Sequence, residues 1–170
     1  GAANLWCLDK DYTVAKRVTG VTVSNGITWS LDQKTMYYID SNEFAVVAFE
    51  YDRDTGAIAD PKPVVVVPQN MGKPDGMCID AEGKLWIALF RCGAVGRWDP
   101  NDGSLMELVK IPALHVTACA FGGKNMNTLY VTTARDPADS QQLTKYPQSG
   151  GLFALETDVQ GAPFFEFGGG

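Results

Sequence analysis

The sequence has 170 residues, of which 45% are hydrophobic and 20% charged, a composition typical of a soluble globular protein with a sizeable core. The formal net charge is −6 at pH 7 and lysine and arginine form no cluster, so we expect no nucleic-acid partner. The longest apolar run, residues 63–68, is far too short to cross a membrane, so we expect no membrane association.

The cysteines indicate a reducing compartment. Cys7, Cys78, Cys92 and Cys119 form no C-x-x-C pair, and three of them fall in predicted strands. We therefore expect reduced thiols in a cytoplasmic protein. His115 is the only histidine, so a zinc site built from cysteine and histidine is not expected.

Strands are predicted from alternating hydrophobicity, β-branched and aromatic residues, and turns rich in Gly, Pro, Asn and Asp. The chain opens with two strands, within residues 4–19. They resemble the third and fourth strands of a four-stranded unit whose first two strands are missing. We therefore expect residues 1–170 to be part of a longer protein.

Three four-stranded units follow, at about residues 24–68, 75–111 and 116–167. Their predicted strands are 27–30, 36–40, 45–51 and 64–67; then 77–80, 85–90, 95–98 and 105–111; then 118–121, 129–133, 152–156 and 164–167. A polar loop is predicted over 135–150, and no segment shows helical periodicity of useful length.

The three units repeat one pattern, in which a polar residue and a small residue precede a short apolar strand, a polar turn and a second strand. The polar residues are Asn25, Asp75 and Thr117. Aromatic residues recur at intervals of 48 and then 44 residues, at Tyr38, Trp86 and Tyr130. A repeat of this length made only of short strands predicts an all-β fold, a β-propeller with about three and a half four-stranded blades.

An open stack of this kind would leave an apolar face uncovered at each end. At ~25 cal/mol per Å² of exposed apolar surface, two such faces would remove a large part of the ~5–15 kcal/mol that stabilises an ordinary domain. Propellers avoid this cost by closing the ring. We therefore expect a partner: the missing N-terminal half, as another chain or segment, or a second copy of this chain.

Asn25 and Asp75 are the foremost candidates for chemistry. Each precedes a glycine that permits close backbone approach, at the point where an inner strand opens onto the central axis. One carboxylate and one amide oxygen are hard ligands suited to Ca²⁺ or another divalent cation. The alternative interpretation is structural, because Asn-Gly and Asp-Gly are also common turn dipeptides.

Further candidates depend on position alone. Thr117 occupies the matching place in the third unit and could touch the channel, or could simply enter a strand. Lys73, close to Asp75, could meet an anionic substrate at the channel mouth. We expect His115 to be structural, Trp29, Trp86, Tyr38 and Tyr130 to pack between blades, and Asp40 and Asp80 to accept turn amides.

The motifs carry a family resemblance. Residues 23–30 with 37–41, the segment 74–86, and residues 121–125 with 129–132 resemble the regucalcin (senescence marker protein)/gluconolactonase family. The match extends over nearly the whole chain and is similar to the C-terminal half of such a protein.

The resemblance implies a six-bladed propeller with one divalent cation in its channel, Ca²⁺ first and Zn²⁺, Mn²⁺ or Mg²⁺ as alternatives. It implies that Asn25 and Asp75 are metal ligands and that Asp75 is also the general base. The family's glutamate ligand and its substrate-binding arginine and asparagine belong to positions before Gly1.

The expected function is metal-dependent hydrolysis of a sugar lactone, as in gluconolactonases. Hydrolysis of another ester or an organophosphate is a second enzymatic reading, because the substrate-selecting residues are not in this chain. The alternative from a different class is a non-catalytic propeller protein, assembled from half-propeller chains, that binds calcium or a small ligand.

Overall fold

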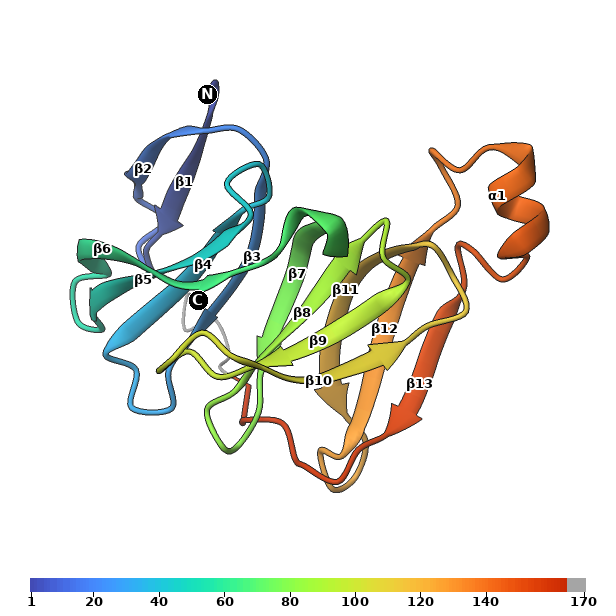
Figure 1. The fold of residues 1–170 in the computed structure, drawn as a ribbon. Coiled ribbons are helices and arrows are strands. Elements are labelled where there is room, and N and C mark those ends of the chain that lie inside the picture. Colours follow the sequence, from blue (N-terminus) through green and yellow to red (C-terminus); the bar gives the residue numbers. More distant parts are fainter. Residues whose placement is uncertain (165–170) are drawn as a thin grey trace.

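The computed structural model describes residues 1–164, and they form short antiparallel strands with almost no helix (Figure 1). The strands are β1 (Ala3–Leu8), β2 (Val14–Val21), β3 (Ser24–Trp29), β4 (Thr35–Asp40), β5 (Ala45–Asp52), β6 (Ala57–Val66), β7 (Lys73–Ile79), β8 (Leu85–Phe90), β9 (Ala94–Trp98), β10 (Leu105–Lys110), β11 (His115–Gly122), β12 (Thr128–Ala134) and β13 (Leu152–Glu156). A 3₁₀ turn, η1 (Gln69–Met71), and a short helix, α1 (Ser140–Lys145), complete the elements. None of the helices in this part of the chain has the length and apolarity needed to cross a membrane.

The strands pair in chain order into successive twisted sheets. β1 pairs with β2, and β3 to β6 form a four-stranded sheet. β7 to β10 and β11 to β13 form two further groups, connected only by the pairing of His115 with Phe90, and we refer to each group as a sheet of its own. Each sheet therefore consists of neighbours in sequence, joined by short turns except between β12 and β13, where residues 135–151 intervene.

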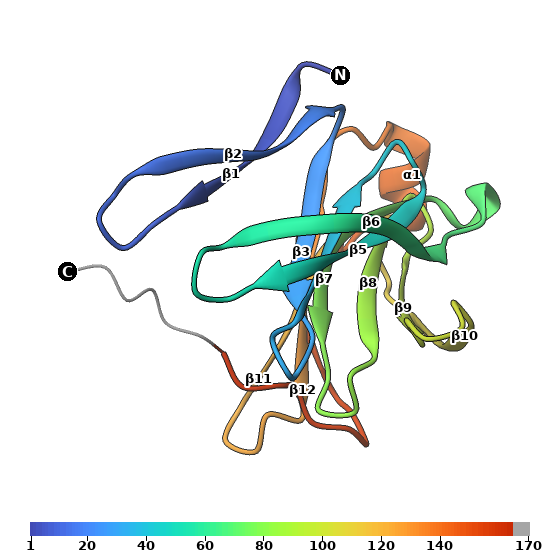
Figure 2. The same ribbon diagram turned by 90° about the vertical axis from the view of Figure 1, so that its left-hand side faces the viewer.

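The first strands of three sheets lie side by side. β3, β7 and β11 run in the same direction, and the later strands of each sheet continue outward from them (Figures 1 and 2). The fold is thus all-β and curled around a row of inner strands, as a propeller requires.

Apolar side chains fill the spaces between successive sheets. β8 is buried on both faces: Leu85, Ile87 and Leu89 pack toward the β3–β6 sheet, whereas Trp86 and Ala88 pack toward β11 and β12. A third cluster lies between the β1–β2 pair and β4. Burial on both faces explains why β8 reads as a continuous apolar run rather than an alternating one.

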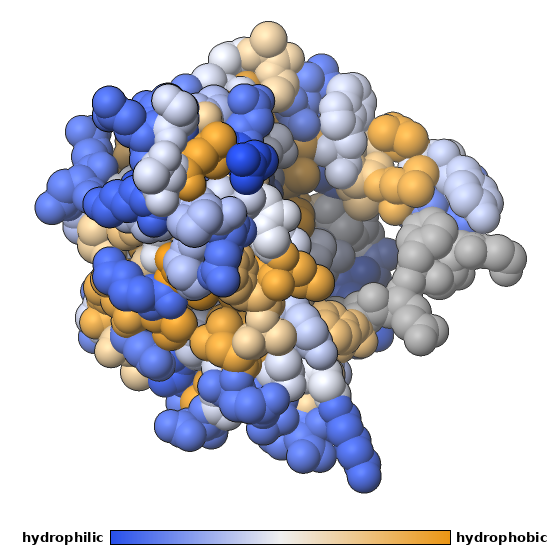
Figure 3. Space-filling model, turned by 90° about the vertical axis from the view of Figure 1, so that its right-hand side faces the viewer, coloured by the Kyte–Doolittle hydropathy of each residue, from blue (hydrophilic) through white to orange (hydrophobic). Residues whose placement is uncertain are grey.

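The two ends of the stack expose apolar side chains. Trp6 is 53% exposed on β1, and Leu152 is 68% exposed on β13. Figure 3 views the side that carries β12 and β13 and shows apolar groups at this surface. Trp86 and Tyr38 are buried as predicted and Trp29 is half-buried, but Tyr130 is 39% exposed, so its predicted place in the core is wrong. Tyr130 lies on the outer face of the last sheet, where no further sheet in the described part of the chain covers it.

After β13 the chain turns back beneath the inner strands, in residues 157–163, which we call the return segment. The amide of Ala162 donates to the carbonyl oxygen of Ile79 at 3.2 Å, and that of Gly161 to Met126 at 2.7 Å. Gly161 also forms an isolated bridge with Asp80. A side chain at Gly161 would clash with Phe121, so only glycine fits at this crossing.

The strand predictions hold with four differences. The strand predicted at 64–67 is β6, which begins seven residues earlier, at Ala57. The inner strands begin three or four residues earlier than predicted, so Asn25, Asp75 and Thr117 lie inside strands rather than before them. The predicted loop 135–150 contains α1, which begins with a capping box between Asp139 and Gln142. The last predicted strand, 164–167, lies for the most part outside the described residues.

Candidate metal and catalytic site

Asn25, Asp75 and Thr117 lie at the same irregularity in three neighbouring strands. The pairing register shifts between Ser24 and Ile27 in β3, Pro74 and Met77 in β7, and Val116 and Ala118 in β11. Each inner strand therefore carries one extra residue, a β-bulge, beside the polar group. A bulge redirects a side chain without ending the strand, and here it does so at the equivalent place in each repeat.

Two glycines bring these bulges together. A Cβ on Gly26 would lie 2.7 Å from the backbone oxygen of Asp75, and a Cβ on Gly76 would lie 2.7 Å from the Cα of Ala118. Such short approaches are possible only because glycine has no side chain. The glycines that follow the polar residues thus set Asn25 beside Asp75, with Thr117 next in the row.

The Asn25 side chain is held by a residue of the turn that follows β4. Its amide nitrogen donates to the hydroxyl oxygen of Ser41 at 3.0 Å, and Ser41 is almost fully buried. Because the nitrogen has this partner, the amide oxygen remains available as an acceptor or a metal ligand.

Asp75 is a half-buried carboxyl with few donors. Burial raises its pKa above the ordinary value, and hydrogen bonding from the Asn25 side chain and the Gly76 amide opposes the rise without cancelling it. The two predicted ligands therefore lie close enough for the Asn25 side chain to influence the Asp75 carboxyl. A carboxylate whose charge is disfavoured by burial would gain from a cation, which would lower its pKa.

The donor set fits a divalent cation of the hard, oxygen-preferring kind. An amide oxygen and a carboxylate are ligands that Ca²⁺ accepts, and Ca²⁺ takes about 6–8 oxygens. Within residues 1–164 no three His, Cys, Asp or Glu side chains gather into a possible metal cluster. Asn25 and Asp75 could therefore supply only part of a coordination shell.

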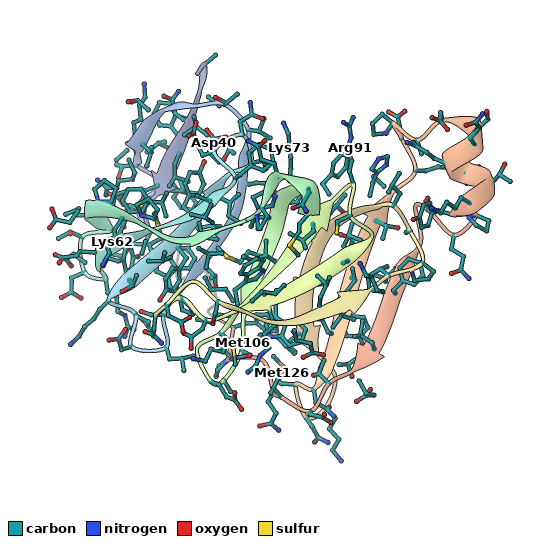
Figure 4. All side chains as sticks on the ribbon, viewed as in Figure 1. Asp40, Lys62, Lys73, Arg91, Met106 and Met126 are labelled. Carbon is teal, nitrogen blue, oxygen red and sulfur yellow. The ribbon has the colours of Figure 1, made fainter. Side chains whose placement is uncertain are left out.

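The other two candidates already have partners. The Thr117 hydroxyl is 2.8 Å from that of Thr132, on the adjacent strand β12. The Lys73 ammonium donates to the Asn42 side-chain oxygen at 2.6 Å and lies 5.8 Å from the centroid of the Phe44 ring. Figure 4 shows Lys73 projecting at the end of the sheets where β7 begins, together with Arg91.

His115 is buried at the start of β11 and stacks on Phe90 with ring centroids 4.5 Å apart. Burial, followed by the charge of Arg91, lowers its pKa below the ordinary value. Its Nδ1 has no hydrogen-bond partner in the described residues. This environment favours the neutral ring and supports the predicted structural role.

The expected roles of Asp40 and Asp80 are confirmed. Asp40 accepts the backbone amides of Thr22 and Val23, and Asp80 accepts those of Glu82 and Lys84.

Asp80 also accepts hydrogen bonds from side chains, which the sequence did not indicate. It is fully buried and also accepts from the Trp86 indole at 2.9 Å and from Arg97 Nε at 2.8 Å. Arg97 then reaches Glu82 at 2.7 Å. The sequence signal that could have revealed this buried ion pair is Arg97, a charged residue among apolar neighbours in the predicted strand 95–98.

The comparisons with known proteins agree with this architecture. The family model described as "SMP-30/Gluconolactonase/LRE-like region" matches residues 1–135. Regucalcin of Gallus gallus is 44% identical over 167 residues, covering 98% of this chain and 56% of that protein. Regucalcin of Homo sapiens is 46% identical over 151 residues, covering 89% of this chain and 50% of that protein.

Solved structures give the same result. A calcium-binding protein, regucalcin, from Agrobacterium tumefaciens matches with a TM-score of 0.90 and 30% identity, over 98% of this chain and 57% of that one. A luciferin-regenerating enzyme matches with a TM-score of 0.86 and 34% identity, over 96% of this chain and 54% of that one.

The fold and its row of inner strands define a protein of the β-propeller class. The chain belongs to the SMP-30/gluconolactonase/LRE-like family. It spans about half the length of the curated relatives that it matches.

Proposed function

We propose that this chain contributes Asn25 and Asp75 to the divalent-cation site of a lactone hydrolase. The observation that carries the proposal is their close approach at matching bulges of β3 and β7, in a chain of this family. A gluconolactonase from Xanthomonas campestris, 26% identical with a TM-score of 0.62 over 76% of this chain and 41% of that one, supports the same reaction class.

The surroundings of Asn25 and Asp75 suit them to different roles. Asn25, oriented by Ser41, would hold the cation through its amide oxygen. When bound, the cation would polarise the lactone carbonyl and acidify a bound water. Asp75 would accept the proton from that water and return it to the leaving oxygen, which needs a carboxylate within hydrogen-bond reach.

Ca²⁺ is the cation we propose first, because both ligands are oxygens and the Agrobacterium relative is described as calcium-binding. Zn²⁺, Mn²⁺ and Mg²⁺ remain the alternatives. Lys73 and Thr117 are proposed to contact the substrate at the rim, where each would exchange its present partner for a substrate oxygen.

The remaining part of the ring is proposed to come from a segment or chain that supplies the N-terminal half, or from a second copy of this chain. The exposed apolar side chains at both ends of the stack support a partner. The four free thiols support a cytoplasmic location. Native mass spectrometry, followed by the denatured mass of each component, distinguishes the two kinds of partner.

The decisive variant is Asp75→Asn, assayed for proton release from gluconolactone in the presence of Ca²⁺. We expect turnover to fall by at least about 100-fold, the scale of a lost general base. Asp54→Asn, on an exposed turn, is the matched control and should keep full activity. Full activity in Asp75→Asn would remove this residue from the mechanism.

The alternative is a binding protein without turnover, and the description of the Agrobacterium relative as a calcium-binding protein favours it. Saturable Ca²⁺ binding by calorimetry, lost in Asn25→Ala, with no lactone hydrolysis under any divalent cation would establish this alternative. Lactone hydrolysis that requires the cation would exclude it.

A further inference from the structure

Cys78 and Cys119 lie against each other below the proposed site. Their sulfur atoms are 3.7 Å apart, and Cys119 Sγ is also 3.3 Å from the carbonyl oxygen of Trp86. Because the Cys119 proton is directed to that carbonyl, Cys78 is the donor to the Cys119 sulfur. The two thiols thus form a short hydrogen-bonded chain that ends on the backbone.

The pair joins two sheets rather than two strands of one ladder. Cys78 belongs to β7, which pairs with β8, whereas Cys119 belongs to β11, which pairs chiefly with β12. The close approach of Gly76 to Ala118 brings the two inner strands together at this level. A covalent bond between the sulfurs would therefore fasten neighbouring sheets at the central axis.

A cavity gives access to the thiols. Both cysteines line a space of about 490 Å³ at the end of the inner strands opposite to the bulges, together with Met77 and Phe121. This volume admits a small oxidant or reductant. Cys7 and Cys92, the other two thiols, do not line this cavity.

We propose that Cys78 and Cys119 form a reversible dithiol–disulfide pair that fastens β7 to β11 and weakens cation binding at Asp75.

The oxidant would be a small hydroperoxide. In the first step a sulfur attacks the peroxide, the O–O bond breaks, and a sulfenic acid and water (or an alcohol) are formed. In the second step the other thiol attacks the sulfenic sulfur, an S–S bond forms, and a second water is released. A small dithiol returns both sulfurs to thiols by exchange and is itself oxidised.

Disulfide formation shortens the distance between the sulfurs from 3.7 Å to about 2.05 Å. In this proposal, part of the approach comes from side-chain rotation and part from a shift of β7 toward β11. Asp75 lies three residues before Cys78 on β7, while Asn25 is on β3, on the other side of β7. The movement therefore separates the two groups of the proposed cation site, and this part of the inference rests on the proposed function.

The Cys78 thiol is protected at neutral pH. Hydrogen bonding to Cys119, followed by burial, raises the pKa of Cys78 well above its ordinary value. Since the thiolate is the reactive form, oxidation should be slow near neutrality and faster as pH rises.

The first experiment uses the Cys7→Ser/Cys92→Ser background, so that only the pair remains. After exposure to hydrogen peroxide, peptide mapping should find a Cys78–Cys119 cross-link that dithiothreitol removes. A matched Cys119→Ser variant in the same background should yield sulfenic acid at Cys78 and no cross-link. Two free thiols, or only over-oxidised cysteine, in the pair-bearing protein would overturn the proposal.

The second experiment measures Ca²⁺ affinity by calorimetry in reduced and oxidised protein. We expect an affinity about fivefold lower, or more, after oxidation, on the usual scale of coupling between sites, with recovery after dithiothreitol. An unchanged affinity in cross-linked protein would overturn the coupling. If the reduced protein binds no Ca²⁺, the proposed function fails, and the peptide map alone decides the disulfide.

Discussion

Asp75 and Asp80 lie five residues apart, yet their surroundings are opposite. Asp80 is fully buried and accepts from two backbone amides, the Trp86 indole and Arg97. Asp75 is less buried, but burial outweighs its few donors and raises its pKa. A buried carboxylate with a full set of donors stabilises a fold, whereas one short of donors is available for a ligand or a proton.

The strongest test of this contrast is Asp80→Ala. Removal of the carboxylate would leave Arg97 without its buried partner, and breaking such a pair costs about 3–5 kcal/mol. Urea unfolding should report this loss. Asp99→Ala, which removes a more exposed partner of Lys84, should cost less than about 1 kcal/mol. Equal losses in the two variants would contradict the structural role of Asp80.

A second test displaces Asp75 without changing it. In Gly76→Ala the new Cβ would lie 2.6 Å from the Cβ of Ala118, and overpacking of this kind costs about 1–3 kcal/mol. We expect lower stability and weaker Ca²⁺ binding. Ala118→Gly would not rescue the variant, because the Cα of Ala118 and the backbone oxygen of Thr117 would still lie 2.7 and 2.8 Å from the new Cβ. Unchanged stability and Ca²⁺ affinity in Gly76→Ala would mean that the close approach of β7 and β11 does not set the position of Asp75.

Asp75→Asn should change the free energy of unfolding in the opposite direction to Asp80→Ala: it should stabilise the fold. Because the folded pKa lies above the ordinary value, the stability contributed by Asp75 falls as pH rises through that window and stays lower at neutral pH. The amide removes this cost, so the midpoint of thermal unfolding should rise slightly at pH 7 and remain nearly unchanged at pH 3. Added Ca²⁺ should stabilise the native protein but not the variant.

The smallest effect concerns His115, a third buried titratable group. Its folded pKa is lowered, so its contribution to stability is present at neutral pH and is lost as pH falls below about 6.5 and through the folded pKa. His115→Phe should keep the contact with Phe90 and give a flatter stability profile between pH 7 and 5. An identical slope in both proteins would show that other groups cause the acid loss.

Much of the fold could be predicted because its signals are local. Alternation, turn residues and a repeat near 46 residues placed most strands, and the polar residue before glycine marked where Asn25 and Asp75 meet. Their proximity follows from the topology, since equivalent ends of neighbouring inner strands converge on one axis.

The features that the sequence did not predict depend on contacts between distant residues. The bulges at Asn25, Asp75 and Thr117 leave no trace in a hydrophobic pattern, so the strands appeared to start later than they do. Tyr130 has the sequence environment of a core residue, and only the position of its sheet at the end of the stack exposes it. The Cys78–Cys119 contact depends on how two sheets meet, which no spacing along the chain encodes.

The return segment affects how the protein unfolds. By bonding β7 to a stretch that follows β13, it closes a loop of more than 80 residues across the base of two sheets. The return segment is bonded to the last sheet through Met126 and to the neighbouring sheet through Ile79 and Asp80, so the two sheets cannot separate until one of these sets of contacts is released. We therefore expect the last two sheets to unfold as a single cooperative unit that is least protected at the open edge of the stack.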